Sequence, residues 1–249
     1  MKKVIFLSLI FTLSIFGDYS NHIDSKIVID ELVSKHGFDE SYVIEVLKNA
    51  EKREEMLQSV AKPAEKTKTW DEYKAIFIKT KRIRDGKKFI LKNITTLEKA
   101  EKEFGVPKEI ITAILGVETN YGSNKGGYRV IDSLTTLGFD DPRRSKFFRR
   151  ELIEFFLLTR ENNLDILNTK GSYAGAMGYG QFISSSYRAY AIDYDGDGYA
   201  DLFDSVDDSI GSTASYLARH GWKREGKIVT RTYPNNVRKF YKPHESLTR

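Results

Sequence analysis

Segments that carry helix start and stop signals follow one another along most of this 249-residue chain. Such signals, combined with apolar residues three and four positions apart, are typical of amphipathic helices. Only the segment Lys227–Tyr233 favours a strand, because β-branched residues occur at every second position within it, as is typical of a strand. The sequence therefore predicts a mainly α fold with little β structure. The expected helices cover about residues 24–35, 39–60, 69 onward, 89–104, 107–118, 141–162, 184–191 and 207–220.

Caps and glycines set the expected helix boundaries. Asp24 and Asp39 are suitable N-cap residues, and residues 69–72, Thr-Trp-Asp-Glu, form a capping box. Gly37 and Gly105 are stop signals. Residues 61–68 are expected to form a connector, and the glycines within 119–140 and 168–182 predict loops there.

The first 17 residues have the pattern of an export signal. Lys2 and Lys3 precede the 13 apolar or small residues Val4–Phe16, a stretch too short for a comfortable membrane span. No small-residue cleavage pattern follows, so an uncleaved N-terminal anchor is an open alternative. The chain has no cysteine, which excludes disulfides, thiolate metal sites, a cysteine nucleophile and a Cys-linked lipoprotein. We exclude residues 1–17 from the fold and expect the rest to lie outside the cytoplasm.

The formal net charge is +5, and residues 222–249 hold eight Lys or Arg against two Glu. An excess of basic over acidic residues can indicate that a protein binds nucleic acid. In an exported protein it favours an anionic surface or polymer of the cell envelope. A solvated basic tail without a partner is an equally open interpretation.

Glu118 is the strongest candidate for a catalytic residue. It follows Ile114 by four positions and Ile111 by seven, so we expect it on the apolar stripe of the helix that Pro107 opens. Desolvation in an apolar groove raises the pKa of a carboxyl, and the negative end of a helix acts in the same direction. A protonated acid near neutral pH is what general acid catalysis requires. A last-turn glutamate that faces solvent is the alternative.

The acidic segment 193–204 fits a twelve-residue calcium loop. The residues at loop positions 1, 3, 5, 6 and 7 are Asp193, Asp195, Asp197, Gly198 and Tyr199. Asp201 can act at position 9, and Asp204 replaces the usual glutamate at position 12, which should lower the affinity. We predict a structural Ca²⁺ site, with a plain Asp/Gly turn as the alternative. A calcium sensor is disfavoured because such proteins usually pair two loops.

Residues 170–182 carry four glycines among small and aromatic residues. Glycine lets a backbone approach a ligand closely. Ser172, Tyr179 and Gln181 add neutral hydrogen-bonding groups, which suit a sugar polymer. A tight structural loop around a small-residue core is the alternative.

Four motifs together resemble the B-type family of lytic murein transglycosylases. They are Gly116–Thr119, Asp141–Arg144, Gly175–Phe182 and the calcium loop, and the resemblance runs from about Thr69 to Trp222. It implies a lysozyme-like helical core that cleaves peptidoglycan between N-acetylmuramic acid and N-acetylglucosamine, leaving 1,6-anhydromuramic acid ends. It also implies a periplasmic protein, either soluble or associated with the inner membrane through an uncleaved signal, with glycan strands and no nucleic acid as partner.

The resemblance also implies roles for individual residues. Glu118 is the single catalytic acid and then the base, since the N-acetyl group of the substrate can stabilise the oxocarbenium-like centre without a second carboxylate. The implied sugar-binding residues are Tyr73, Arg143, Arg144, Ser172, Gln181 and Tyr216. The implied calcium ligands are Asp193, Asp195, Asp197, Tyr199 and Asp204.

The implied organisation places N-terminal helices in 18–68, the catalytic core in 69–222 and a short basic tail in 223–249. Family members continue past the region of Trp222 into a segment that closes the cleft, whereas this chain has only the basic tail. Two alternatives therefore stay open: a non-catalytic or partner-dependent peptidoglycan-binding protein, and a lysozyme-type hydrolase.

Overall fold

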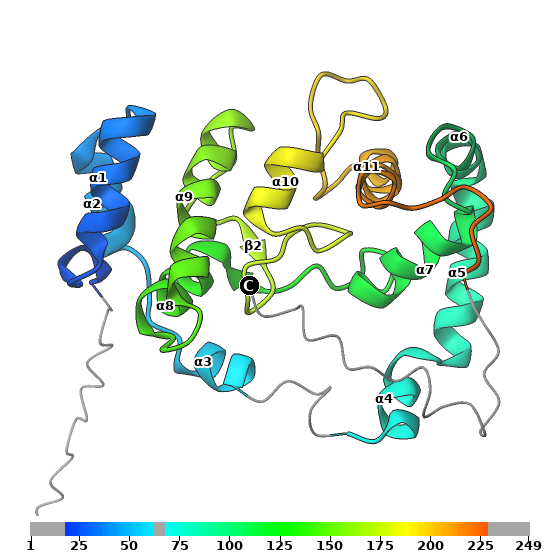
Figure 1. Ribbon diagram of the computed structural model, residues 1–249, viewed down its shortest axis with the longest axis horizontal. Helices are drawn as coiled ribbons and strands as arrows, with labels where there is room; N and C mark the ends of the chain where they lie inside the picture. The colour runs from blue at the N-terminus through cyan, green and yellow to red at the C-terminus, as the bar shows by residue number, and fades with distance from the viewer. Residues whose placement is uncertain (1–17, 62–67, 229–249) are drawn as a thin grey trace, which may run out of the picture.

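The computed structural model describes residues 18–61 and 68–228 (Figure 1). The export signal at 1–17, most of the connector at 61–68 and most of the basic tail lie outside these ranges. Within them the regular secondary structure is helical apart from two two-residue strands, so the prediction of a mainly α fold is confirmed. No helix in these ranges is both long enough and apolar enough to cross a membrane.

The helices lie in the following order. They are α1 (Ser25–His36), α2 (Glu40–Lys48), α3 (Glu54–Ala61), α4 (Trp70–Phe77), α5 (Thr80–Lys92), α6 (Ile94–Phe104), α7 (Lys108–Thr119), α8 (Val130–Asp140), α9 (Ser145–Glu161), α10 (Ser184–Tyr190) and α11 (Val206–Arg219). A 3-10 turn, Tyr19–Asn21, precedes α1. The strands β1 (Tyr128–Arg129) and β2 (Lys170–Gly171) pair antiparallel.

Buried side chains form two hydrophobic clusters. The first joins α1, α2 and α3 to α8 and α9, with Phe155 and Phe156 fully buried. The second joins α5, α6, α7 and α11 around Leu97, Ile111 and Leu115. Phe182, before α10, belongs to the first cluster. The region where α7, α10 and α11 come together is therefore a seam between the two clusters, and Figure 1 shows these three helices in the central part of the molecule.

Several predicted helix boundaries are confirmed. In the capping box before α4, the Thr69 amide donates to the Glu72 carboxylate at 2.8 Å, and the Thr69 hydroxyl accepts from the Glu72 amide. Gly37 and Gly105 end α1 and α6 in the left-handed conformation.

The single helix predicted over 39–60 is wrong, because α2 ends at Lys48 and α3 begins at Glu54. Side chains of α8 capture the backbone in between. The Glu51 amide donates to Asp132 at 2.8 Å, and the Arg53 amide donates to Thr136 at 3.1 Å. These bonds replace the helical ones that a continuous helix would make.

The loop predicted over 119–140 is wrong for its second half, which forms α8. Ten of the eleven residues of α8 are buried. A helix buried on all sides has no polar face, so it lacks amphipathic periodicity. Gly138 is a packing residue, since a Cβ there would lie 3.3 Å from the Arg149 amide nitrogen.

Two further boundaries differ from the predictions, and the predicted strand lies mostly outside the described residues. The helix predicted over 89–104 is two helices that meet at Asn93, whose side chain donates to the Phe89 carbonyl. Asp141 accepts the amides of Arg143 and Arg144, so it caps a turn and α9 begins only at Ser145. Of the predicted strand, only residues 227–228 are described, and they are not in a strand.

A candidate active-site groove and metal loop

A groove of about 330 Å³ lies at the seam between the two clusters. Helix α7, the end of the glycine-rich loop, α10 and α11 form its walls. The lining residues are Ile114, Glu118, Gly180, Gln181, Phe182, Ile183, Ser186, Thr213, Tyr216 and Leu217. Glu118 is the only acidic side chain among them.

Glu118 lies in the last turn of α7, beside Ile114 in the groove. The buried stripe of α7 consists of Ile111, Thr112, Leu115, Gly116 and Thr119. Glu118 flanks these buried residues and, as predicted, lies on the side of Ile114, with which it lines the groove. The side chain is exposed toward the groove, yet desolvation raises the pKa of its carboxyl, as predicted. An open groove removes part of the hydration shell without closing over the acid.

The end of α7 is fixed to the glycine-rich loop. The buried Thr119 hydroxyl donates to the Tyr179 carbonyl at 2.9 Å and accepts from the Gly122 amide at 2.9 Å. These bonds set the position of Glu118 relative to the opposite wall of the groove. The sequence offers no sign of this role for Thr119.

Gln181 is held in the left-handed region, with φ of 51°. Its side-chain amide donates to the Gly178 carbonyl at 3.0 Å and to the Lys125 carbonyl at 3.3 Å. The side-chain carbonyl oxygen accepts no bond from the described residues and is available to a ligand. Gly178 is required there, because a Cβ would lie 2.3 Å from the Leu202 carbonyl oxygen.

Aromatic rings fix Tyr216 at the α11 side of the groove. Phe182 and Tyr190 meet its ring edge-on, with centroids at 5.6 and 5.2 Å. His220 stacks on it at 3.9 Å. The Tyr216 ring is thus held in place as one wall of the groove.

Ser172 and Tyr73, two predicted sugar-binding residues, do not line this groove. The Ser172 hydroxyl accepts the amides of Ala174 and Ala176 and so shapes the glycine-rich loop. Tyr73 lies in α4, where its ring contacts Phe77 edge-on. Figure 1 shows α4 below α5, apart from the rest of the helices.

Arg143 and Arg144 also lie away from the groove lining. Both are exposed in the turn before α9, and the Arg144 guanidinium lies over the rings of Phe147 and Phe148 at 4.6 and 5.1 Å. The structure therefore brings Glu118, Gln181 and Tyr216 together and leaves the other four predicted residues outside.

The acidic loop offers a compact set of oxygen ligands. One carboxylate oxygen from each of Asp193, Asp195 and Asp197 lies within 4.8 Å of the other two. Two ligands that bind Ca²⁺ at about 2.4 Å can be at most about 4.8 Å apart, so this triad could bind such an ion. Gly198 has φ of 101°, which explains why position 6 needs glycine.

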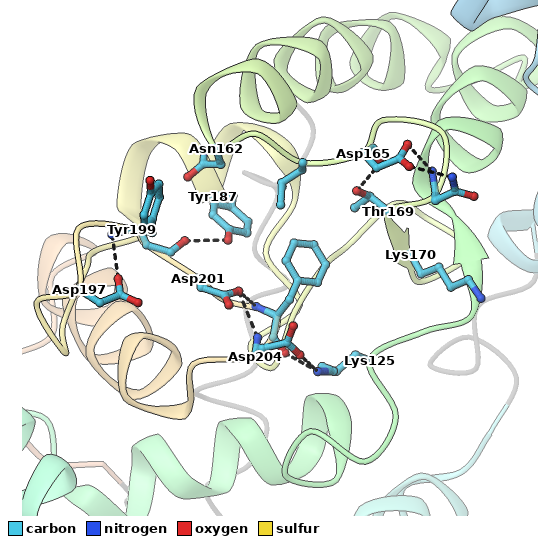
Figure 2. Close-up of a pocket in the computed structure, with 14 residues that line it drawn as sticks. Lys125, Asn162, Asp165, Thr169, Lys170, Tyr187, Asp197, Tyr199, Asp201 and Asp204 are labelled. Atoms are coloured by element: carbon cyan, nitrogen blue, oxygen red, sulfur yellow. Dashed lines mark hydrogen bonds and ion pairs between the residues drawn. The ribbon is translucent and has the colours of Figure 1, made fainter.

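Asp204 lies apart from this triad. It is exposed and pairs with Lys125 at 3.2 Å, while Asp201 accepts the Phe203 and Asp204 amides. Figure 2 shows these side chains around a second cavity of about 550 Å³, between the acidic loop and residues 162–170. Tyr199 also lines this cavity, which does not include Glu118.

Asp208 and Lys125 are structural residues of the site that the sequence analysis missed. Asp208 is fully buried and accepts the amides of Tyr194, Asp195 and Asp201, so it fixes the acidic loop to α11. Its place three residues after Ser205 fits a helix cap, which is the only visible signal. Lys125 donates to the Phe203 carbonyl and lies 5.0 Å from the Tyr179 ring centroid. No sequence pattern marks it.

Comparisons with known proteins show which family this chain resembles in sequence and in structure. The model of the family "Transglycosylase SLT domain" matches residues 24–247. Membrane-bound lytic murein transglycosylase B of Escherichia coli (strain K12) is 41% identical over 222 residues, which cover 86% of this chain. The chain spans 61% of the length of that relative.

Solved structures of lytic transglycosylases share the fold. Soluble lytic transglycosylase SltB1 from Pseudomonas aeruginosa matches with a TM-score of 0.77 and 47% identity, over 81% of this chain and 68% of that one. The Escherichia coli lytic transglycosylase Slt35 in complex with calcium matches with a TM-score of 0.79 and 40% identity, over 85% and 67%. These matches confirm the lysozyme-like helical class.

Proposed function

The chain belongs to the transglycosylase SLT domain family, that of the lytic murein transglycosylases, and from this membership we propose its reaction. The protein cleaves peptidoglycan between N-acetylmuramic acid and N-acetylglucosamine and leaves 1,6-anhydromuramic acid ends. The observation that carries this proposal is a single desolvated glutamate in a groove with no second acid in its described lining.

Glu118 acts first as the acid. Its raised pKa favours the protonated form, which donates to the glycosidic oxygen as the bond breaks. The N-acetyl group of the muramic acid stabilises the developing positive charge, so a second carboxylate is not required. Glu118, now deprotonated, takes the proton of the 6-hydroxyl, and the 6-oxygen bonds to the anomeric carbon. No water is added.

Gln181 and Tyr216 bind the sugars beside the cleaved bond. The uncommitted carbonyl oxygen of Gln181 can accept a bond from a sugar hydroxyl or amide, and the Tyr216 ring offers an apolar face or edge. The remaining proposed sugar-binding residues, Tyr73, Arg143, Arg144 and Ser172, lie outside the groove lining and act along a longer glycan strand or through the glycine-rich loop.

A structural calcium ion belongs to the 193–204 loop in this proposal. Asp193, Asp195 and Asp197 would supply the first carboxylate oxygens and Tyr199 its carbonyl, and Asp204 would complete the set once its ion pair with Lys125 opens. The ion joins acids that otherwise repel one another and stiffens the loop beside α11. The relative Slt35 crystallised with calcium supports this assignment.

We place the protein in the periplasm, where peptidoglycan lies. Its N-terminal segment, residues 1–17, directs export or anchors it to the inner membrane. Residues 18–68 form an N-terminal helical lobe, 69–222 the catalytic core and 223–249 a basic tail.

Muropeptide analysis tests the proposed reaction. The protein is incubated with purified sacculi, and the soluble products are separated and identified by mass spectrometry. Anhydro-ended muropeptides, lighter by one water than reducing ones, support the transglycosylase. Reducing ends alone would indicate a hydrolase, and sacculus binding without soluble products would indicate a non-catalytic binding protein.

A further inference from the structure

Helix α5 is strongly basic. Its 13 residues include six Lys or Arg against one Asp, a net of +5 that equals the formal net charge of the whole chain. Such a concentration of one sign on one helix attracts anionic ligands. The groove described above uses no residue of α5.

Part of this basic helix forms one wall of a separate cavity of about 250 Å³. Lys81, Lys88 and Lys92 line it from α5. Asn120 and Ser123, which follow the end of α7, line the other wall. The site is thus a small basic cavity at the end of the helix that carries Glu118.

Two of the three lysines are available to a ligand. Lys81 pairs with Asp85, the one acid in the lining. Lys88 and Lys92 make no ion pair or hydrogen bond with any described residue. Asp85 is close enough to Lys88 to interact with it electrostatically, but one acid against three lysines leaves a net positive charge in the lining.

The opposite wall is a rigid corner. Asn120 and Tyr121 both have left-handed backbones, with φ of 52° and 60°, and Asn120 is the C-cap that ends α7. The Tyr121 hydroxyl donates to the Arg82 carbonyl at 2.8 Å, and its ring lies 5.4 Å from that of Phe89. Gly86 is needed to admit this ring, since a Cβ would lie 2.5 Å from the Tyr121 hydroxyl oxygen.

Neutral polar groups complete the site. The side-chain amide of Asn120 and the hydroxyl of Ser123 make no hydrogen bond with the described residues. Two ammonium groups opposite an amide and a hydroxyl form a set of donors suited to a carboxylate. The volume suits one or two residues of a peptide better than a sugar strand.

We propose that this cavity binds a free carboxylate of the peptide stem of peptidoglycan, an inference that rests on the function proposed above. Each stem hangs from a muramic acid, so a stem next to the cleaved bond leaves the groove near Glu118. Asn120 follows Glu118 by two residues and turns the chain toward α5. Lys88 and Lys92 attract the carboxylate, and Asn120 and Ser123 orient it. The cavity thereby makes the protein prefer strands that still carry their stems.

A paired substitution tests this site. The variant Lys88→Gln/Lys92→Gln removes both free charges of the cavity. The matched control, Lys79→Gln/Lys87→Gln, removes two exposed charges, one from the N-cap of α5 and one from the helix itself, and neither residue lines the cavity. Cleavage is measured on intact sacculi and on glycan strands stripped of stems by an amidase. On intact sacculi we expect the kcat/KM of the cavity variant to fall roughly tenfold, because two exposed charge interactions with the stem are lost. On stripped strands its kcat/KM should equal that of the wild type. The control should match the wild type on both.

A binding measurement separates this inference from the proposed reaction. Calorimetric titration compares a disaccharide-peptide muropeptide with the same disaccharide without its peptide. The site is supported, even if no cleavage is observed, when the cavity variant binds the peptide-bearing ligand more weakly than the wild type does and the control variant does not. Equal affinity of wild type and variant for that ligand, or equal losses on stripped and intact strands, overturns it. Selective loss of binding to phosphatidylglycerol vesicles, with stem recognition unchanged, would assign the cavity to a lipid surface instead.

Discussion

Replacing Asp208 should destabilise the fold more than replacing any other acid of the metal loop region. One of its carboxylate oxygens accepts the Tyr194 amide at 2.6 Å and the Asp195 amide at 3.2 Å, and the other accepts the Asp201 amide at 2.8 Å. The residue is fully buried. Water cannot replace an acceptor that is lost.

The size of the effect follows from these three bonds. In Asp208→Asn, one oxygen becomes an NH₂ group that faces a backbone N–H, so at least one buried donor is orphaned. An orphaned buried donor costs about 1–3 kcal/mol, and the remaining bonds lose their charge assistance, which gives about 2–3 kcal/mol in total. Asp208→Ala removes both acceptor oxygens and with them all three bonds, and we expect a loss of about 3–6 kcal/mol.

Urea unfolding in saturating calcium measures this loss. The control is Asp207→Asn, which removes the same charge from the same first turn of α11 but accepts one side-chain bond, from Thr96. Both substitutions weaken the favourable interaction with the helix N-terminus equally. If the two variants unfold within about 0.5 kcal/mol of each other, Asp208 does not anchor the loop.

Four further predictions concern the groove, the acidic loop and the glycine-rich loop. Because Glu118 must be protonated to donate, kcat/KM should fall as pH rises through its raised pKa, and a profile that rises there would refute the acid role. The pKa of Glu118 is higher in the folded than in the unfolded state, so the folded state loses stability as the pH rises from the unfolded pKa through the folded pKa. Glu118→Gln should therefore melt at a higher temperature than the wild type when the pH is above both pKa values, and at the same temperature when the pH is below both. Chelation should lower the melting temperature, since free Ca²⁺ at one hundred times Kd stabilises by about 2.7 kcal/mol, and Asp195→Asn should abolish the calcium-dependent shift. Gly178→Ala should cost at least about 2 kcal/mol in urea unfolding, because a Cβ there clashes with the Leu202 carbonyl and φ is 70°.

Local signals predicted the elements whose structure is set locally. The capping box at Thr69, the stop at Gly105 and the ligand spacing from Asp193 to Asp197 depend on residues a few positions apart. The sequence also marked Glu118 and Gln181 as candidates, since each belongs to a short motif whose order along the chain is distinctive, and the structure places both in the lining of one groove.

Features set by distant contacts could not be predicted in this way. The break between α2 and α3 depends on Asp132 and Thr136, more than 80 residues along the chain. Helix α8 is buried on all sides, so its apolar residues do not recur with the spacing of an amphipathic helix. Gly138 within it also favours the prediction of a loop. Asp208 looks like a helix cap in the sequence, and only the fold shows that it holds the loop that precedes its helix.

The most direct test compares the products of wild-type and Glu118→Gln protein on purified sacculi. The wild type should release anhydro-ended muropeptides, and the Gln variant, which cannot donate or take up the proton, should release them at least about a hundredfold more slowly. It should still bind sacculi and melt at least as high as the wild type above the raised pKa. A Gln variant that forms anhydro ends at the wild-type rate would contradict the central claim that one desolvated carboxyl carries the reaction.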